Sequence, residues 1–240
     1  MAAALARGWG EPVLVRDPDA ERASALAADT GGEALSSSAE VARQADLVVL
    51  CHKPAQLADV AAEIDGAAAA VASILWGVRT AALEDHYPDA PVYRFIPNIP
   101  VEVGRGVLGY ASGASAARGP EAAVLELFGR LGTVIAVDEE LMDAAGAVLG
   151  CGPAFFALVA EALADAGMRR GLDSEEARMM AVETMAGTAA VLHERELDTG
   201  DLRRRVASPG GVTERGLDVL ERAGMREDID RAAATVLGER

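Results

Sequence analysis

The feature that most constrains the fold is a change of pattern near residue 138. Before it, short apolar runs alternate with helix-like segments, and after it the spacing of apolar residues is helical throughout. Alternation of this kind predicts a doubly wound parallel sheet of the Rossmann type. The sequence therefore predicts an α/β domain over residues 1–137, followed by an all-helical domain over residues 138–240.

Turn and capping residues delimit the expected elements of the first part. We expect strands over residues 12–16, 47–51, 70–75, 92–96, 106–111 and 133–137, and helices over residues 19–29, 55–64, 80–87 and 120–131. Asp17 and Pro18 are predicted as the N-cap and first residue of one helix, which Gly31 ends. Ser38 is predicted to cap a short helix that follows.

The second part contains an apolar stripe at helical spacing. The stripe consists of Phe155, Leu158, Val159, Ala162 and Leu163. Asp173 to Glu176 read as a capping box that opens a long helix through about His193. A stripe of this length on a small helical domain predicts burial against a partner chain.

Charge and composition narrow the function classes. The net charge of −16 argues against a nucleic-acid or anionic-membrane partner, because both need a basic surface. The uncharged run Gly66 to Val78 is too short for a membrane span, which takes about 20 apolar residues, and no signal peptide is evident at Met1. Cys51 and Cys151 lie far apart without metal-ligand spacing. We expect a reduced, cytoplasmic protein without a metal site.

Lysine is nearly absent. Of the 22 basic residues, Lys53 is the sole lysine. Where charge alone is needed, a composition this biased would place arginine, so Lys53 is a candidate functional residue, with chance as the alternative.

The segment Ser208-Pro209-Gly210-Gly211-Val212-Thr213 is a candidate anion site. Proline and glycines exclude a helix there, so the next helix begins at about Val212 with its first N–H groups unpaired. A carboxylate suits such a position, and the hydroxyls of Ser208 and Thr213 add donors. The alternative is an ordinary loop with a threonine near a helix start.

The flanks of this segment resemble the signature of the Δ1-pyrroline-5-carboxylate reductase family. Further matches follow in family order over essentially the whole chain. They are Leu202–Ala207, Gly216–Glu221, Ala45–Leu50, Lys53-Pro54, Arg94–Asn98 with Pro100, Gly152-Pro153-Ala154 and Glu161–Gly167.

The resemblance implies hydride transfer from a nicotinamide to the C=N carbon of a cyclic imino acid, giving proline, in an interlocked homodimer. It implies that Ser208, Gly211, Val212 and Thr213 hold the substrate carboxylate, with the Thr213 hydroxyl beside the imine nitrogen. No catalytic histidine is required.

The resemblance also implies a dinucleotide cofactor, NADP with NAD possible. Arg16 would lie at an adenosine 2′-phosphate, whereas Asp17 would repel that phosphate and could bind the ribose hydroxyls of NADH, or would act as an N-cap. The family positions around the adenosine and phosphates fall on Ser38, Cys51, Lys53 and Pro54, and those at the nicotinamide end fall on Trp76, Gly77 and Asn98. Asn98 reads equally well as a turn between two prolines.

Several residues depart from the family pattern and make the site region less polar. Trp76 replaces a small residue, where it would narrow the pocket, stack on a ring or block binding. Ile99 replaces a threonine, Leu149 and Cys151 replace serines, and Phe155 replaces a tyrosine. These changes leave open a related reductase of another cyclic imine.

The sequence also lacks the Gly-x-Gly turn that opens a dinucleotide-binding fold. Its residues from Met1 resemble the helix directly after that turn. We expect an upstream start or a truncation, with a catalytically silent dimerising protein as the alternative. Strands that flanked the missing one would expose unpaired edges, which predicts aggregation or poor cofactor binding.

Overall fold

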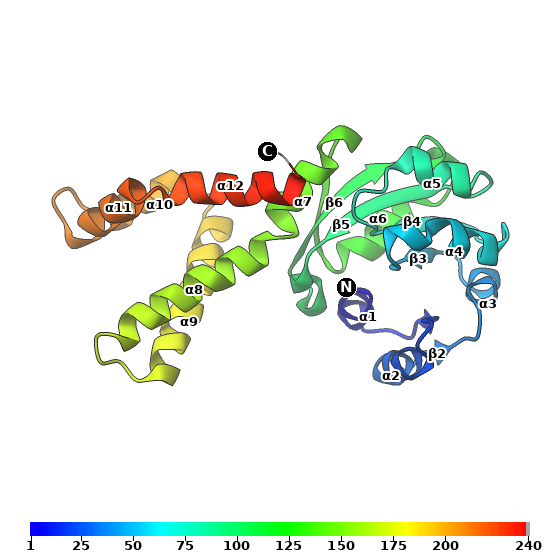
Figure 1. Ribbon diagram of the computed structural model, residues 1–240, viewed down its shortest axis with the longest axis horizontal. Coiled ribbons are helices and arrows are strands. Elements are labelled where there is room, and N and C mark those ends of the chain that lie inside the picture. Colours follow the sequence, from blue (N-terminus) through cyan, green and yellow to red (C-terminus); the bar gives the residue numbers. More distant parts are fainter. Residues whose placement is uncertain (239–240) are drawn as a thin grey trace. The chain divides into compact units, whose positions relative to one another are not determined.

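Short strands rich in β-branched residues build the sheet of the first half. The computed structural model describes residues 1–238, and its compact units are Met1–Pro153 and the part from Ala154 onward. Five strands of the first unit form one sheet in chain order (Figure 1). They are β3 (Val48–Leu50), β4 (Val71–Ser73), β5 (Val92–Pro97), β6 (Gly106–Ser112) and β7 (Gly132–Ala136). The expected α/β class is confirmed.

One strand pair departs from the expected parallel pattern. β3 with β4, β4 with β5, and β6 with β7 are parallel, but β5 and β6 are antiparallel, with Phe95 opposite Tyr110. The connection between them holds a short 3-10 helix, Ile99–Val103, and no α-helix. A parallel return would need a crossover of roughly a dozen residues or more, so this short connection leads to an antiparallel neighbour.

The remaining strands form a separate sheet. β1 (Leu14–Val15) pairs in parallel with β2 (Glu33–Ala34), a strand that the sequence analysis did not predict. β1 and β3 are thus edge strands of different sheets.

Helices cover both faces of the five-stranded sheet. On one face, α1 (Ala2–Trp9) and α6 (Glu121–Gly129) pack through Leu5 and Phe128 onto β4, β5 and β6. On the other, α3 (Ser38–Gln44), α4 (Leu57–Ile64) and α5 (Thr80–His86) pack onto β3, β4 and β5. The rings of Phe95 and Phe128 stack with centroids 3.8 Å apart.

Two helix caps lie one or two positions from the predicted residues. α2 (Ala20–Thr30) is capped by Asp19, whose carboxylate accepts from two backbone N–H groups, and not by Asp17. α3 is capped by Ser37, and Ser38 is its first residue. The predicted end of α2 at Gly31 is confirmed, because Gly31 adopts the left-handed conformation with φ 68°.

The first unit continues past the last strand. A 3-10 helix (Glu139–Leu141) and α7 (Met142–Leu149) follow β7, and α7 packs against β5 and β6. The strands end near the expected boundary at residue 137, whereas the compact unit extends to Pro153.

A buried charge network anchors this extension. The Arg94 side chain on β5 is only 1% exposed and pairs with Glu139 and Asp143, each at 2.9 Å. Glu139 also accepts from the backbone N–H of Thr80 at 3.0 Å. A charge within an otherwise apolar strand is therefore neutralised by the segment that ends the unit.

The second unit is helical, as expected. Its helices are α8 (Gly152–Met168), α9 (Ser174–Glu194), α10 (Thr199–Val206), α11 (Val212–Arg222) and α12 (Met225–Leu237). Asp173 caps α9 by accepting from Glu175 and Glu176, which confirms the predicted start. The buried residues that form its core are four alanines on α8 and α9.

Helix α8 belongs to the most apolar stretch of the chain. Within the mostly helical stretch Glu139–Met168, an 18-residue window has a mean hydropathy of 1.8, so the stretch could cross a membrane by length and composition alone. The expectation based on Gly66 to Val78 overlooked it. One such helix is weak evidence for a span, and exposed apolar faces of this kind also form interfaces between chains.

Candidate active site

The carboxyl ends of parallel strands gather most of the predicted cofactor residues. Residues 51–54 follow β3, residues 76 and 77 follow β4, and Asn98 follows β5. Because these three strands are parallel neighbours, their carboxyl ends lie at one edge of the sheet. Ligands of such sheets bind at that edge.

The Cys51–Pro54 segment forms a structured turn at this edge. Lys53 donates its backbone N–H to the side chain of Gln56 at 3.0 Å, and its carbonyl contacts the His52 ring at 2.9 Å. Cys51, Lys53 and Pro54 are all exposed. The turn is thus held by local contacts, and the Lys53 ammonium forms no ion pair with any side chain of residues 1–238.

The indole ring of Trp76 packs against Gly146 of α7, where any larger residue would collide with it. The Trp76 side chain is 41% exposed, and a Cβ added at Gly146 of α7 would lie 2.3 Å from the indole ring. Ile96 borders the same position. Gly146 therefore seats the ring, and Gly77 next to it adopts a positive φ of 71° that suits glycine.

Asn98 has a structural role in this arrangement. It is buried, and its side-chain oxygen accepts from the backbone N–H of Val107 at 2.9 Å. The side chain therefore fixes the start of β6 to the end of β5. This contact fits the interpretation of Asn98 as a turn residue and leaves its amide nitrogen available.

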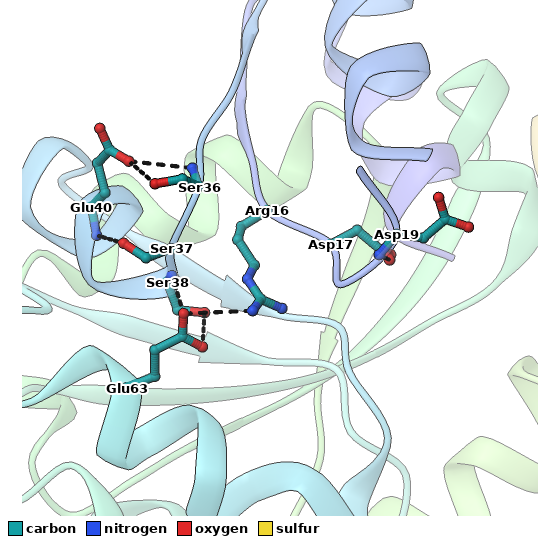
Figure 2. A network of polar contacts seen from close by, with 8 residues as sticks. All are labelled: Arg16, Asp17, Asp19, Ser36, Ser37, Ser38, Glu40 and Glu63. Atoms are coloured by element: carbon teal, nitrogen blue, oxygen red, sulfur yellow. Dashed lines mark hydrogen bonds and ion pairs between the residues drawn. The ribbon is translucent and has the colours of Figure 1, made fainter. Parts of the chain in front are cut away.

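Arg16 and Ser38 converge on a carboxylate. Arg16 follows β1, Ser38 begins α3, and both point to Glu63 on α4 (Figure 2). The Ser38 N–H donates to Glu63 Oε1 at 2.8 Å and its hydroxyl to Oε2 at 2.9 Å, while Arg16 Nη2 lies 3.6 Å from Oε1. Glu63 is a site residue that no local sequence pattern singles out.

Asp17 turns away from this cluster. Its carboxylate accepts from the backbone N–H of Asp19 at 2.9 Å and pairs with Arg22 at 3.5 Å. Figure 2 shows Asp17 beside Asp19 on the far side of Arg16. Asp17 thus supports the start of α2 and does not face Ser38.

The predicted cradle has the expected backbone geometry. Helix α11 begins at Val212, as predicted, and Gly210 adopts a left-handed φ of 73° before it. The Gly211 N–H bonds to Ser208, and Glu214 accepts from the Gly210 N–H at 2.6 Å. The structure thus brings the predicted substrate-binding residues together at one helix start.

An open surface groove adjoins the cradle within the second unit. Its volume is about 710 Å³, and its lining comes from α9, α10 and α11. The lining includes Thr184, Thr188, Arg203, Thr213 and Leu217. Thr213 is therefore the cradle residue that faces a space large enough for a small organic acid.

No candidate metal site is found among the described residues 1–238. Residues 1–238 contain no group of three or more His, Cys, Asp or Glu side chains placed to hold a metal ion. The two cysteines are free thiols.

Two family models together match most of the chain. Residues 139–238 match the family described as pyrroline-5-carboxylate reductase dimerisation. Residues 1–76 match the family described as NADP oxidoreductase, coenzyme F420-dependent. The two matches lie on either side of the expected domain boundary.

Individual relatives align over nearly the whole length. A pyrroline-5-carboxylate reductase of Synechocystis sp. is 35% identical over 92% of this chain and 84% of its own length. A pyrroline-5-carboxylate reductase of Mycobacterium tuberculosis is 37% identical over 92% of this chain and 83% of its own length. Among solved structures, a Plasmodium falciparum pyrroline carboxylate reductase with NADP bound has a TM-score of 0.87 and 27% identity, covering 98% of this chain and 90% of that chain.

Proposed function

Because this chain belongs to the pyrroline-5-carboxylate reductase family, we propose that it reduces 1-pyrroline-5-carboxylate to L-proline with a nicotinamide cofactor. The observation that supports the proposal is the loop before α11, where within residues 1–238 no side chain caps the helix N-terminus and the hydroxyl-bearing residues Ser208 and Thr213 lie on either side of it in sequence. A small carboxylate fits such a set of donors.

In the proposed reaction the cofactor supplies a hydride to the C=N carbon of the substrate. The protonated imine is already electrophilic, so the protein mainly binds and orients it. Ser208, Gly211 and Val212 hold the carboxylate, and the Thr213 hydroxyl lies at the imine nitrogen, which keeps its proton as it becomes an amine.

The cofactor is proposed to bind in the first unit, at the edge of the sheet where the carboxyl ends of β3, β4 and β5 lie. Arg16, Ser38, Cys51, Lys53 and Pro54 take the adenosine and phosphate end. Trp76, Gly77 and Asn98 take the nicotinamide end. The contacts of Arg16 and Ser38 with the Glu63 carboxylate support this placement, because the same donors suit an anionic group. NADP is the proposed cofactor, with NAD as the second candidate.

The second unit is proposed to form a homodimer. Its large apolar side chains lie on the surface, including Phe156, Leu163, Met179 and Met180, each more than half exposed. We propose that a second copy of this chain packs against these side chains and buries them. We propose a cytoplasmic location without a nucleic-acid or membrane partner, on the basis of the net charge of −16.

A second candidate is reduction of another cyclic imine. The packing of the Trp76 ring against Gly146 favours this second candidate, because the family has a small residue at the position of Trp76. One extra or missing methylene in such a pocket changes selectivity by about 10-fold or more.

The test is oxidation of NADPH and of NADH by the purified protein with 1-pyrroline-5-carboxylate, followed at 340 nm. We expect saturable turnover that yields proline. Cofactor binding without turnover of this substrate, but with turnover of a different cyclic imine, would replace the first candidate with the second.

A further inference from the structure

The contacts of Glu63 are those of a bound anion. One carboxylate oxygen accepts from the Ser38 N–H at 2.8 Å and lies 3.6 Å from Arg16, and the other accepts from the Ser38 hydroxyl at 2.9 Å. A phosphate monoester accepts the same kinds of bond. The donors at this site therefore already serve an anion supplied by α4 (Figure 2).

Glu63 is charged at neutral pH. Its bond from the Ser38 backbone N–H, followed by the bond from the hydroxyl and the charge of Arg16, holds the pKa of the Glu63 carboxyl below its ordinary value. The Glu63 side chain is 31% exposed and that of Arg16 is 27% exposed, so both remain within reach of a ligand. An incoming anion would meet a site that is already neutralised.

We propose that Glu63 sets the choice between phosphorylated and unphosphorylated cofactors, by competing with an adenosine 2′-phosphate for Arg16 and Ser38. The inference rests on the proposed function only in taking these residues as the place where the adenosine end binds. Glu63 acts here as a specificity-determining residue and takes no part in hydride transfer.

The direction of the effect follows from charge. A phosphate monoester carries nearly two negative charges, so it must either displace the Glu63 carboxylate or lie beside it. Both alternatives weaken binding of the 2′-phosphate. A free 2′-hydroxyl has no such conflict, because it can donate a hydrogen bond to the same carboxylate.

The test uses two fragments that differ only in the 2′-phosphate. Adenosine 2′,5′-bisphosphate and adenosine 5′-monophosphate are titrated calorimetrically into the wild type and into Glu63→Gln, which keeps the size of the side chain and removes its charge. We expect Glu63→Gln to bind the bisphosphate about tenfold more tightly and the monophosphate within about twofold of the wild type. An unchanged ratio of the two affinities would overturn the proposal.

Glu40 provides a matched control. Its carboxylate also accepts from a serine N–H and hydroxyl, those of Ser36, at 3.2 and 3.1 Å, but it belongs to α3. Glu40→Gln removes one charge from the same region and should leave the affinity ratio near that of the wild type. An equal gain in Glu40→Gln would show a general charge effect and overturn the assignment to Glu63.

The double variant Arg16→Gln/Glu63→Gln measures how far the effect of Glu63 on bisphosphate affinity depends on Arg16. The gain for the bisphosphate should largely vanish, because the freed donor is gone. A gain that persists without Arg16 would contradict the proposed competition.

A further measurement needs no variant. A crystal structure of the wild type with the bisphosphate should show Glu63 withdrawn from Arg16, and an intact Arg16–Glu63 pair beside the bound 2′-phosphate would overturn the proposal. Neither binding nor crystallography depends on turnover. Failure of the proposed reaction would therefore be seen separately, in the reductase assay.

Discussion

The two units of this chain bury their apolar residues very differently. Residues 1–153 enclose large side chains on both faces of a sheet, such as Phe95, Phe128 and Leu83, each fully buried. The second unit buries four alanines on α8 and α9, while its large apolar side chains stay on the surface. The first unit therefore has its own core, whereas the second has the surface of a protein that is completed by another chain.

The largest expected effect concerns that surface. Leu163→Asp would place a charge on the apolar face of α8, where the side chain is 58% exposed. Because a symmetric interface contains each residue twice, we expect the dissociation constant of the dimer to rise about 100-fold or more. Sedimentation equilibrium would measure it.

Val103→Asp is the matched control in the first unit. Val103 is 74% exposed and lies in the 3-10 helix after β5. Its substitution should leave the association state unchanged. If both variants dissociate, or if neither does, the contrast drawn between the two units is wrong.

The next effect concerns the buried charge of the first unit. Arg94→Met would leave Glu139 without its cationic partner, and Arg94 Nε and Glu139 Oε2 already lack hydrogen-bond partners within residues 1–238. Removing one member of a buried ion pair costs about 3 kcal/mol, so we expect a clearly lower free energy of unfolding in denaturant titrations.

Arg7 offers the exposed counterpart. It also joins two carboxylates, those of Asp29 and Glu102, but its side chain is 47% exposed. Arg7→Met should barely move the unfolding midpoint, since water and salt screen such pairs. Equal destabilisation by the two variants would contradict the importance assigned to burial.

A smaller effect is expected at Trp76, the largest apolar side chain that the first unit leaves exposed. Trp76→Ala should raise kcat/KM for a bulkier cyclic imine relative to pyrroline-5-carboxylate by about tenfold. Gly146→Ala should shift the same ratio, because its methyl group would displace the ring.

Gly129→Ala is the control for that pair, since nothing lies within 4 Å of its added methyl group. It should leave the ratio of the two kcat/KM values unchanged. A Trp76→Ala variant with the substrate preference of the wild type would remove the reason for the second candidate function.

Features set by local chemistry were predictable from the sequence. Gly31 ends α2, Asp173 starts α9 and Val212 starts α11 because capping and helix-breaking residues act on their immediate neighbours. Of three consecutive serines, however, Ser37 and not Ser38 is the cap. The pattern fixes a helix start only to within a residue or two when neighbours share the same chemistry.

Features set by tertiary contacts were harder to predict. Glu63 meets Ser38 from 25 residues away, and it is one of 38 acidic residues that no local pattern singles out. Two signals were present but not used. Arg94 is a charge within an apolar strand, and the short connection before Gly106 excludes a parallel return.

The most direct test of the proposed site is the steady-state rate of Thr213→Ala beside Thr213→Ser with 1-pyrroline-5-carboxylate. The account predicts that the alanine variant loses about 100-fold in kcat, because the hydroxyl that orients the protonated imine nitrogen is gone. The serine variant should keep most of the rate, and both should remain dimeric. Wild-type turnover by Thr213→Ala would contradict the role assigned to the cradle.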